Sequence, residues 1–391
     1  MMEKATQKRK ICFVTTVSIT MKSFVVETAK YLHEQMGWDI TLICSPDEAF
    51  AASLPEYLHY IPVQMNRGMD LSALKSIRQF VKMFKREKFD LVQYSTPNAA
   101  CYASIAAKIA KVPVRLYAQW GIRYVGMSGM ARKIFRAIEK MVCRNSTHIR
   151  SVSPMNRAFG IEEKLYRPEK VKVVGNGGTI GVSLEDYDIS QKAQWRKAVR
   201  TEYKISESDM VFGFAGRVSA DKGCGELLQA FRQVAENDKN AKLMVVGPVE
   251  DRCGIDAALL QWAKEASQVV FTGKVNNADM KRFYAAMDVL VHPSYREGFG
   301  MVIQEAGALA VPVITTRIPG ASEVMVEGTS CLLVEPKNAE ELATAMGKVC
   351  TGEIDVARLG QAAYERTKIL YARPVMLENQ RKDYESLFCK F

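Results

Sequence analysis

The sequence predicts an α/β protein built from two doubly wound, parallel-sheet domains, and three observations support this. The chain has 391 residues, which at roughly 150 residues per domain favours two or three domains. Short β-branched runs alternate with helix-length amphipathic segments along the whole chain. The runs are almost continuously apolar, which is typical of parallel strands covered by helices on both faces. We expect the two Rossmann-like domains to face a cleft, because open parallel sheets bind ligands at the carboxyl ends of their strands.

The alternation predicts the elements in order. In the first half the predicted strands are 11–17, 39–44, 90–94, 114–118, 148–152 and 171–174, and the helices between them include 23–36, 72–87, 98–111 and 130–144. In the second half the predicted strands are 211–215, 242–246, 269–272, 288–292, 313–315 and 331–334, each followed by a helix-like stretch. We place a first domain at 1–185, a second domain at 186–373, and a final helix at 374–391 that packs back on the first domain.

Composition excludes several classes of protein. With 48% hydrophobic and 25% charged residues, the chain is neither disordered nor a coiled coil. It holds no apolar run of the roughly 18 residues that span a bilayer. The basic N-terminus lacks a signal-peptide core, so we expect a cytoplasmic protein. Residues 1–190 carry 28 Lys and Arg against 17 Asp and Glu, whereas residues 191–391 carry 26 of each. This imbalance predicts an anionic partner for the first half.

The segment 288–320 carries the most informative chemistry. A strand is followed by Glu297, then by a glycine-rich turn at 298–300, and then by a helix that holds Glu305. We expect the amides of Gly300, Met301 and Val302 to point from the N-terminus of this helix, an arrangement that suits a phosphate or diphosphate. The two carboxylates would repel phosphate, so they are better suited to accept hydrogen bonds from the hydroxyls of a sugar and a ribose. This combination predicts a nucleotide-sugar pocket. We therefore expect 186–373 to be the nucleotide-sugar-binding domain and 1–185 to be the acceptor-binding domain.

These residues resemble the retaining glycosyltransferases of family 4, which have the GT-B fold. The family's E-x7-E signature matches Glu297 and Glu305, inside REGFGMVIQE. Its Gly-Arg and Lys-Gly elements match Gly216 with Arg217 and Lys222 with Gly223, directly after the predicted strand VFGFA. The resemblance covers nearly the whole chain and is most specific over 214–336.

The resemblance implies a role for each matched position. Arg217, Lys222 and Glu297 would be catalytic: the two cations would neutralise the donor diphosphate, and Glu297 would hold the sugar. Glu305 would accept hydrogen bonds from the ribose hydroxyls. The implied donor-binding residues are Gly216, Lys274, Val275, Gly298, Phe299, Gly300, Met301, Val302 and Glu305. No metal and no cofactor is implied, because the two cations and the helix dipole would stabilise the negative charge of the diphosphate.

The first half departs from the family in two places. The loop after the first strand reads TTVSITMKSF and contains no glycine, where the family has a glycine-rich turn. The family's His-Gly after the strand VRLYA is replaced by Gln119-Trp120-Gly121. We therefore assign no catalytic base. A retaining front-face displacement, in which the leaving phosphate receives the acceptor's proton, does not need one.

The segment 117–182 resembles the branch of this family that builds bacterial surface polysaccharides and lipid-linked oligosaccharides. Its basic amphipathic helix is of a kind that lies on anionic membranes, and the alternative that it is simply a solvated surface stays open. The residues proposed to face the acceptor or membrane are Trp120, Arg123, Arg132, Lys133 and Arg136. The expected partners are a UDP-sugar in preference to a GDP-sugar, a glycan or polyprenyl-diphosphate-linked acceptor, and the cytoplasmic face of the inner membrane. Nucleic acid is not expected, because the basic residues are not interleaved with stacking aromatics.

We therefore predict a retaining glycosyltransferase that moves a hexosyl or N-acetylhexosaminyl group in surface polysaccharide synthesis. Two alternatives stay open: a nucleotide-sugar 2-epimerase of the same fold, and a non-enzymatic sugar-binding protein. The Asp186-Tyr187-Asp188 segment imitates a D-x-D metal motif, but it lies in an acidic connector and is interpreted as solvated linker. His292, at a strand end, is expected to support the turn at Glu297.

Overall fold

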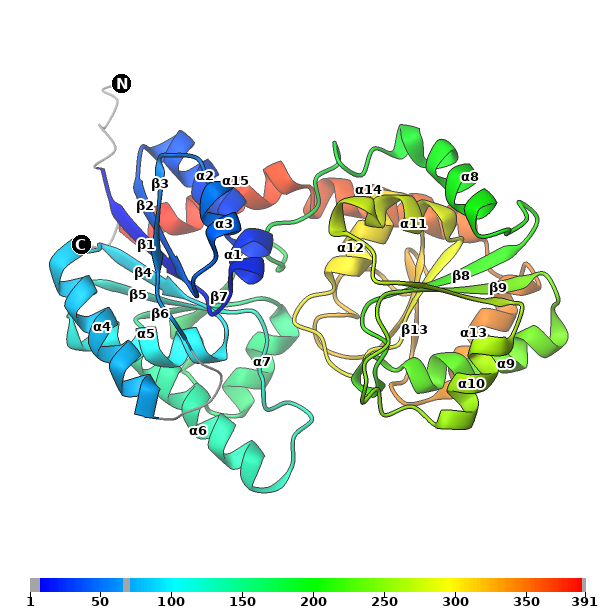
Figure 1. Ribbon diagram of the computed structural model, residues 1–391, viewed down its shortest axis with the longest axis horizontal. Coiled ribbons are helices and arrows are strands. Elements are labelled where there is room, and N and C mark those ends of the chain that lie inside the picture. The colour runs from blue at the N-terminus through cyan, green and yellow to red at the C-terminus, as the bar shows by residue number, and fades with distance from the viewer. Residues whose placement is uncertain (1–7, 66–70, 389–391) are drawn as a thin grey trace. The chain divides into compact units, whose positions relative to one another are not determined.

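The structure, a computed structural model, describes residues 8–65 and 71–388 and contains two compact units (Figure 1). Unit 1 consists of Met1–Ile180 and Met376–Phe391, and unit 2 of Gly181–Val375. The chain therefore passes from one unit to the other twice, after Ile180 and after Val375. The predicted boundaries lie after residues 185 and 373. The predicted cleft between the domains stays a prediction.

Unit 1 contains a seven-stranded parallel sheet in the order β3-β2-β1-β4-β5-β6-β7. Its strands are β1 (Lys10–Val14), β2 (Asp39–Cys44), β3 (Leu58–Pro62), β4 (Leu91–Tyr94), β5 (Val114–Gln119), β6 (His148–Ser151) and β7 (Val171–Val173). The sequence did not predict β3. This edge strand is short, ends in proline and is only partly buried, so it lacks the continuous apolar pattern of the central strands. The strand predicted at 11–17 ends at Val14, because the chain turns there into a helix.

Helices cover both faces of this sheet (Figure 1). On one face lie α1 (Ser18–Phe24), α2 (Val26–Met36), α3 (Glu48–Ala52) and the C-terminal helix α15 (Arg373–Ser386). On the other lie α4 (Leu71–Glu87), α5 (Pro97–Ile109), α6 (Gly129–Asn145) and α7 (Pro154–Glu162). The single helix predicted at 23–36 is wrong in one respect: a non-helical Val25 separates α1 from α2.

The C-terminal helix α15, red in Figure 1, lies beside α2, drawn in blue. Tyr31 of α2 donates from its hydroxyl to Oε2 of Glu378 over 3.1 Å. Arg150 of β6 pairs with Asp383 over 2.6 Å. The Tyr384 ring packs edge-on against Phe13 of β1, with centroids 6.0 Å apart. These contacts join α15 to α2 and to the sheet of unit 1.

Unit 2 contains a six-stranded parallel sheet in the order β10-β9-β8-β11-β12-β13. Its strands are β8 (Met210–Ala215), β9 (Ala241–Val246), β10 (Val269–Gly273), β11 (Val289–His292), β12 (Val313–Thr316) and β13 (Cys331–Val334). One face is covered by α9 (Cys224–Asn237), α10 (Ala257–Glu265) and α13 (Ala339–Cys350). The other is covered by α8 (Lys192–Glu202), α11 (Met280–Ala286), α12 (Met301–Ala308) and α14 (Val356–Leu370). The two parallel sheets confirm the predicted fold class.

Over residues 8–65 and 71–388, no helix combines the length and apolar content needed to cross a membrane. Within the same ranges, no group of three or more His, Cys, Asp and Glu is arranged to hold a metal ion. Metal independence stays a prediction.

Candidate functional site

The residues predicted to be catalytic lie on two loops of unit 2, which follow the adjacent strands β8 and β11. The loop after β8 leads through a short 3-10 turn to Gly223, whose backbone has φ +68°. A Cβ atom at Gly223 would lie 2.0 Å from the carbonyl oxygen of Pro293, so only glycine permits this approach. The Tyr295 amide donates to the Asp221 carbonyl over 3.0 Å. The two loops are therefore held together by backbone packing.

This approach brings Lys222 to Glu297. The Lys222 ammonium nitrogen lies 2.5 Å from Oε1 of Glu297, and Nε2 of His292 lies 2.9 Å from the same oxygen. The Lys222 and Glu297 side chains are only 21% and 15% exposed. His292 thus contacts Glu297, as expected. Lys222 and Glu297, which the sequence assigned to one site, contact each other directly.

The electrostatic setting of Glu297 keeps it ionised. Burial by itself would raise its pKa, but the hydrogen bond from His292 and the charge of Lys222 outweigh burial and hold the pKa well below its ordinary value. Glu297 is therefore an acceptor of hydrogen bonds at neutral pH. It is a group suited to hold hydroxyls and unsuited to donate a proton.

Arg217, directly after β8, is half-exposed and surrounded by carboxylates. Its guanidinium donates to Glu250 and lies 3.4 Å from Asp221. Arg296 lies 3.8 Å from the same Asp221 carboxylate. The hydrogen bond to Glu250 raises the pKa of Arg217, against a smaller opposing effect of burial. Gly216 directly follows β8 and donates its amide to the Val246 carbonyl over 2.9 Å.

The turn before α12 packs against Gly320, a residue to which the sequence assigned no role. Gly320 has φ +82°, and a Cβ there would lie 2.3 Å from the Gly298 carbonyl oxygen. The Gly300 amide donates to the Gly320 carbonyl over 2.9 Å. The prediction that this amide points at phosphate is therefore wrong in this conformation. Met301 and Val302 form the first turn of α12, and their predicted phosphate contact stays a prediction.

Phe299 is the one large side chain of this turn. It is buried and packs against Tyr371, with ring centroids 5.6 Å apart. Any contact of Phe299 with a donor would therefore come from its backbone, and that contact stays a prediction. Its side chain instead fixes the turn to the C-terminal end of α14.

Glu305 lies in α12 with its carboxylate facing two tyrosines. The Tyr284 hydroxyl donates to Oε2 of Glu305 over 2.8 Å, and the Tyr187 hydroxyl interacts with the same carboxylate. Burial raises the pKa of Glu305 to about 7, although both hydrogen bonds and the charge of Arg373 oppose the rise. The interpretation of 186–188 as solvated linker is wrong for Tyr187, which is partly buried against Tyr284.

Lys274 and Val275 follow β10, which lies two strands away from β8 in the sheet. Gly273 has φ +69°, and its carbonyl accepts from the Gly247 amide over 2.9 Å. Lys274 is exposed and Val275 is partly buried. They lie at the same carboxyl edge of the sheet as Lys222 and Glu297, and their contact with a base stays a prediction.

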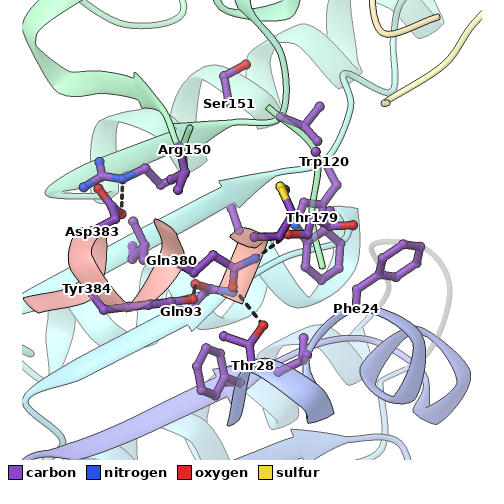
Figure 2. A pocket seen from close by; sticks show the side chains of 18 residues that line it. Phe24, Thr28, Gln93, Trp120, Arg150, Ser151, Thr179, Gln380, Asp383 and Tyr384 are labelled. Atoms are coloured by element: carbon purple, nitrogen blue, oxygen red, sulfur yellow. Dashed lines mark hydrogen bonds and ion pairs between the residues drawn. The ribbon is translucent and has the colours of Figure 1, made fainter. Parts of the chain in front are cut away.

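In unit 1, Trp120 lines a pocket between the sheet and the helices α1, α2 and α15 (Figure 2). Its ring lies 5.2 Å from that of Phe24, which comes from the glycine-free loop and helix after β1. The cavity has about 60 Å³, room for roughly four water molecules and too little for a sugar ring. Trp120 is thus at a pocket wall, but the pocket as it stands does not accommodate an acceptor.

The remaining residues predicted to face acceptor or membrane lie on or beside α6. The Arg123 guanidinium lies over the Phe135 ring, 4.5 Å from its centroid. Arg132 and Arg136 each lie 2.7 Å from the Glu163 carboxylate. Lys133 is exposed. Arg132 and Arg136, two of the four predicted cations, are therefore already neutralised by Glu163, which lies at the C-terminal end of α7.

Comparison with known protein families identifies the family of this chain. The family model described as "Glycosyl transferases group 1" matches residues 196–366, and the model "Glycosyl transferase 4-like" matches residues 10–153. The chain belongs to the group 1 glycosyltransferases. The predictions of family, of the GT-B fold and of a glycosyltransferase are confirmed.

Individual relatives agree along nearly the whole length of this glycosyltransferase. It is 29% identical over 348 residues to the capsular polysaccharide biosynthesis glycosyltransferase CapM of Staphylococcus aureus, covering 89% of this chain and 90% of CapM. It is 21% identical to an Escherichia coli UDP-Gal:alpha-D-GlcNAc-diphosphoundecaprenol alpha-1,3-galactosyltransferase, covering 81% of each chain.

Solved structures agree in fold. A glycosyltransferase from Rickettsia africae ESF-5 matches with a TM-score of 0.81 at 19% identity, covering 98% of this chain and 100% of the other. HepE from Anabaena, in complex with UDP and glucose, matches with a TM-score of 0.79 at 20% identity, covering 97% and 100%.

Proposed function

We propose that this glycosyltransferase transfers a hexosyl or N-acetylhexosaminyl group, with retention of configuration, from a UDP-sugar to a glycan or polyprenyl-diphosphate-linked sugar. The product would be a surface polysaccharide or its lipid-linked precursor. The donor would bind in unit 2, at the carboxyl ends of β8, β10 and β11. Unit 1 would bind the acceptor.

One observation carries this proposal: the contact between Lys222 and Glu297. A lysine that neutralises a leaving diphosphate must lie next to the group that holds the transferred sugar, because the bond that breaks joins the two. The 2.5 Å contact places these groups side by side at the ends of adjacent strands. A site for a neutral metabolite would not need a cation there.

The chemistry follows from this arrangement. The bond between the anomeric carbon and the diphosphate oxygen breaks, and the acceptor oxygen forms a bond to the same face of that carbon. Negative charge grows on the departing diphosphate, where Lys222 and Arg217 would stabilise it more strongly than in the ground state. The acceptor's proton passes to the leaving phosphate oxygen. Glu297, held ionised by Lys222 and His292, would orient the sugar through its hydroxyls.

The names of relatives support the same substrate classes. One relative acts in capsular polysaccharide biosynthesis, and another transfers galactose from UDP-galactose to a lipid-linked GlcNAc diphosphate. A structural neighbour was solved with UDP-glucose. These names favour a UDP-sugar donor and a lipid-linked acceptor for this chain.

We propose further that the protein is peripheral on the cytoplasmic face of the membrane, through α6. Met130 and Ile134, one turn apart, are 68% and 51% exposed. Lys133, Lys140 and Arg144 are exposed on the same helix. An exposed apolar pair flanked by cations is suited to an anionic leaflet. Arg132 and Arg136 contribute less to this surface, because Glu163 neutralises them.

The donor is tested by thermal unfolding in the presence of UDP-, GDP- and ADP-sugars. A ligand at 100 times its dissociation constant stabilises a protein by about 2.7 kcal/mol, so we expect a clear rise in Tm with UDP-sugars. A protein that no nucleoside-diphosphate sugar stabilises would contradict the proposal.

Transfer is then measured with the stabilising donor and a polyprenyl-diphosphate-linked sugar, as release of UDP together with the mass and anomeric configuration of the product. We expect a product of retained configuration. Incubation with UDP-GlcNAc alone provides the control for epimerase activity: formation of an epimer without acceptor would favour the 2-epimerase alternative. Tight sugar binding without UDP release would favour the non-enzymatic one.

A further inference from the structure

Tyr187 lies in the segment 181–188, by which the chain enters unit 2 and which we call the connecting segment. In this segment Val182 pairs with the segment by which the chain leaves unit 2: the Val182 amide donates to the Tyr371 carbonyl, and the Arg373 amide donates to the Val182 carbonyl, both over 2.8 Å. The Tyr187 amide donates to the Ser183 carbonyl over 2.9 Å. These bonds fix the backbone of the connecting segment against unit 2.

The Tyr187 side chain extends from this fixed segment to α11 and α12. Its ring lies against that of Tyr284, with centroids 6.3 Å apart and an angle of 42° between the planes. Its hydroxyl interacts with the Glu305 carboxylate, which accepts a hydrogen bond from Tyr284 over 2.8 Å. Tyr187 therefore contacts the glutamate that the family resemblance assigns to the ribose.

We propose that Tyr187 is a positioning residue for donor recognition, which fixes the Glu305 carboxylate so that it accepts hydrogen bonds from the ribose hydroxyls of the nucleoside diphosphate. This inference rests on the proposed function, because it needs a ribose at Glu305. It adds a residue to the donor site that lies outside the E-x7-E segment.

The physical argument concerns how a carboxylate is oriented. A glutamate side chain has free torsions, and an ionised carboxylate offers about four acceptor positions on its two oxygens. The hydrogen bond from Tyr284 and the neighbouring Tyr187 hydroxyl would occupy part of this capacity and fix the plane of the group, which leaves defined positions for two ribose hydroxyls. Preorganisation of this kind lowers the entropy lost on binding.

The charge on Glu305 leads to the same conclusion. The charged and titratable groups that face it are Tyr187 from the connecting segment, Tyr284 from α11 and Arg373 at the start of α15. Asp186 lies 3.9 Å from the Arg373 guanidinium and balances part of its charge. Burial raises the pKa of Glu305 to about 7, and the Tyr187 hydroxyl is one of the groups that oppose this rise. Without that hydroxyl, more Glu305 would be protonated and unable to accept from both ribose hydroxyls.

The test is a double-mutant-type cycle, in which the Tyr187 hydroxyl is removed from the protein, the ribose hydroxyls are removed from the ligand, or both are removed. Calorimetric affinities for UDP and for 2′,3′-dideoxy-UDP are measured with the full-length protein and with Tyr187→Phe, which keeps the ring and its packing. We expect UDP affinity to fall roughly three- to tenfold in the variant, and the affinity for dideoxy-UDP, which has no ribose hydroxyls to present, to stay unchanged.

Tyr203→Phe provides the matched control. Tyr203 is another tyrosine of unit 2 that packs on α11, with its ring centroid 6.1 Å from that of Phe283, and it interacts with the Glu202 carboxylate. It does not contact Glu305, so its variant should bind both nucleotides as the unmodified protein does.

Equal losses for UDP and dideoxy-UDP in Tyr187→Phe would show a general structural role and overturn the proposal. Unchanged binding of UDP would overturn it as well. In both cases the unmodified protein still binds UDP, so the proposed function survives. If the unmodified protein binds no nucleoside diphosphate, the proposed function and this inference fail together.

Discussion

Lys222 and Glu297, 75 residues apart in sequence, form a partly buried ion pair in which His292 shares the same carboxylate oxygen. The pair is possible because Gly223 allows the loop after β8 to touch the Pro293 carbonyl. A positive and a negative group are thus held at the positions where a leaving diphosphate and a sugar would meet.

Lys222→Met should lower kcat by about 10²- to 10³-fold, the usual effect of removing one group that stabilises transition-state charge. The methionine retains most of the alkyl stem, so the loss would come from the charge. Initial rates of UDP release at saturating donor provide the measurement. Lys348→Met, which removes an exposed lysine paired with Glu353, is the control and should retain full activity. A kcat within threefold of the unmodified value would remove Lys222 from the mechanism.

Glu250→Gln should tighten UDP binding by about two- to fivefold. Glu250 pairs with Arg217, so a diphosphate must compete with it for the guanidinium. Exposed ion pairs are worth about 0.2–1 kcal/mol, which sets the size of the gain. Isothermal titration with UDP measures it, and Glu236→Gln, which removes the partner of Arg232 on α9, should bind UDP as before. Weaker binding in Glu250→Gln would mean that Glu250 supports Arg217 instead of competing for it.

Glu305→Gln should stabilise the protein above neutral pH and have little effect in acid. The folded protein raises the pKa of this group from 4.5 to about 7, so between those values the folded state binds more protons than the unfolded state. Stability from this group therefore falls as the pH rises through that window. We expect a gain of about 1–3 kcal/mol at pH 8 and almost none at pH 4.5.

Thermal unfolding at the two pH values measures this difference. Glu353→Gln, an exposed carboxylate of unit 2, is the control. An equal gain at both pH values would show that ionisation of Glu305 is not the cause. The same Glu305→Gln variant should bind UDP more weakly than the unmodified protein at pH 8, since an amide accepts fewer hydrogen bonds than a carboxylate.

Charge reversal on α6 should abolish membrane binding if this helix lies on an anionic leaflet. The exposed cations Lys133, Lys140 and Arg144 are changed together to Glu, which leaves the pairs of Arg132 and Arg136 with Glu163 intact. Each basic residue near such a surface contributes about 1 kcal/mol, so binding should fall by at least 10²-fold. Co-sedimentation with phosphatidylglycerol vesicles measures it, with phosphatidylcholine vesicles as reference.

The matched control reverses three exposed cations of unit 2, namely Lys264, Lys348 and Arg358. This variant should sediment with vesicles as the unmodified protein does. Undiminished binding by the α6 variant would refute the membrane contact through this helix.

The sequence by itself determined the parallel-strand architecture, the family, and a short set of candidate residues. Strand and helix periods are local properties, and so is the spacing of Glu297 and Glu305 around a glycine turn, so they can be read along the chain. The sequence missed β3, because an edge strand that ends in proline has no clear apolar pattern.

Only the tertiary structure decided which groups contact the candidates. The pairing of Arg217 with Glu250, the packing of Gly320 on Gly298 and the contact of Tyr187 with Glu305 each join segments from different strands or loops. The ends of parallel strands come together only when the sheet forms, and the burial that raises the pKa of Glu305 exists only in the packed state. A pattern along the chain encodes neither the partner across the sheet nor the loss of solvent.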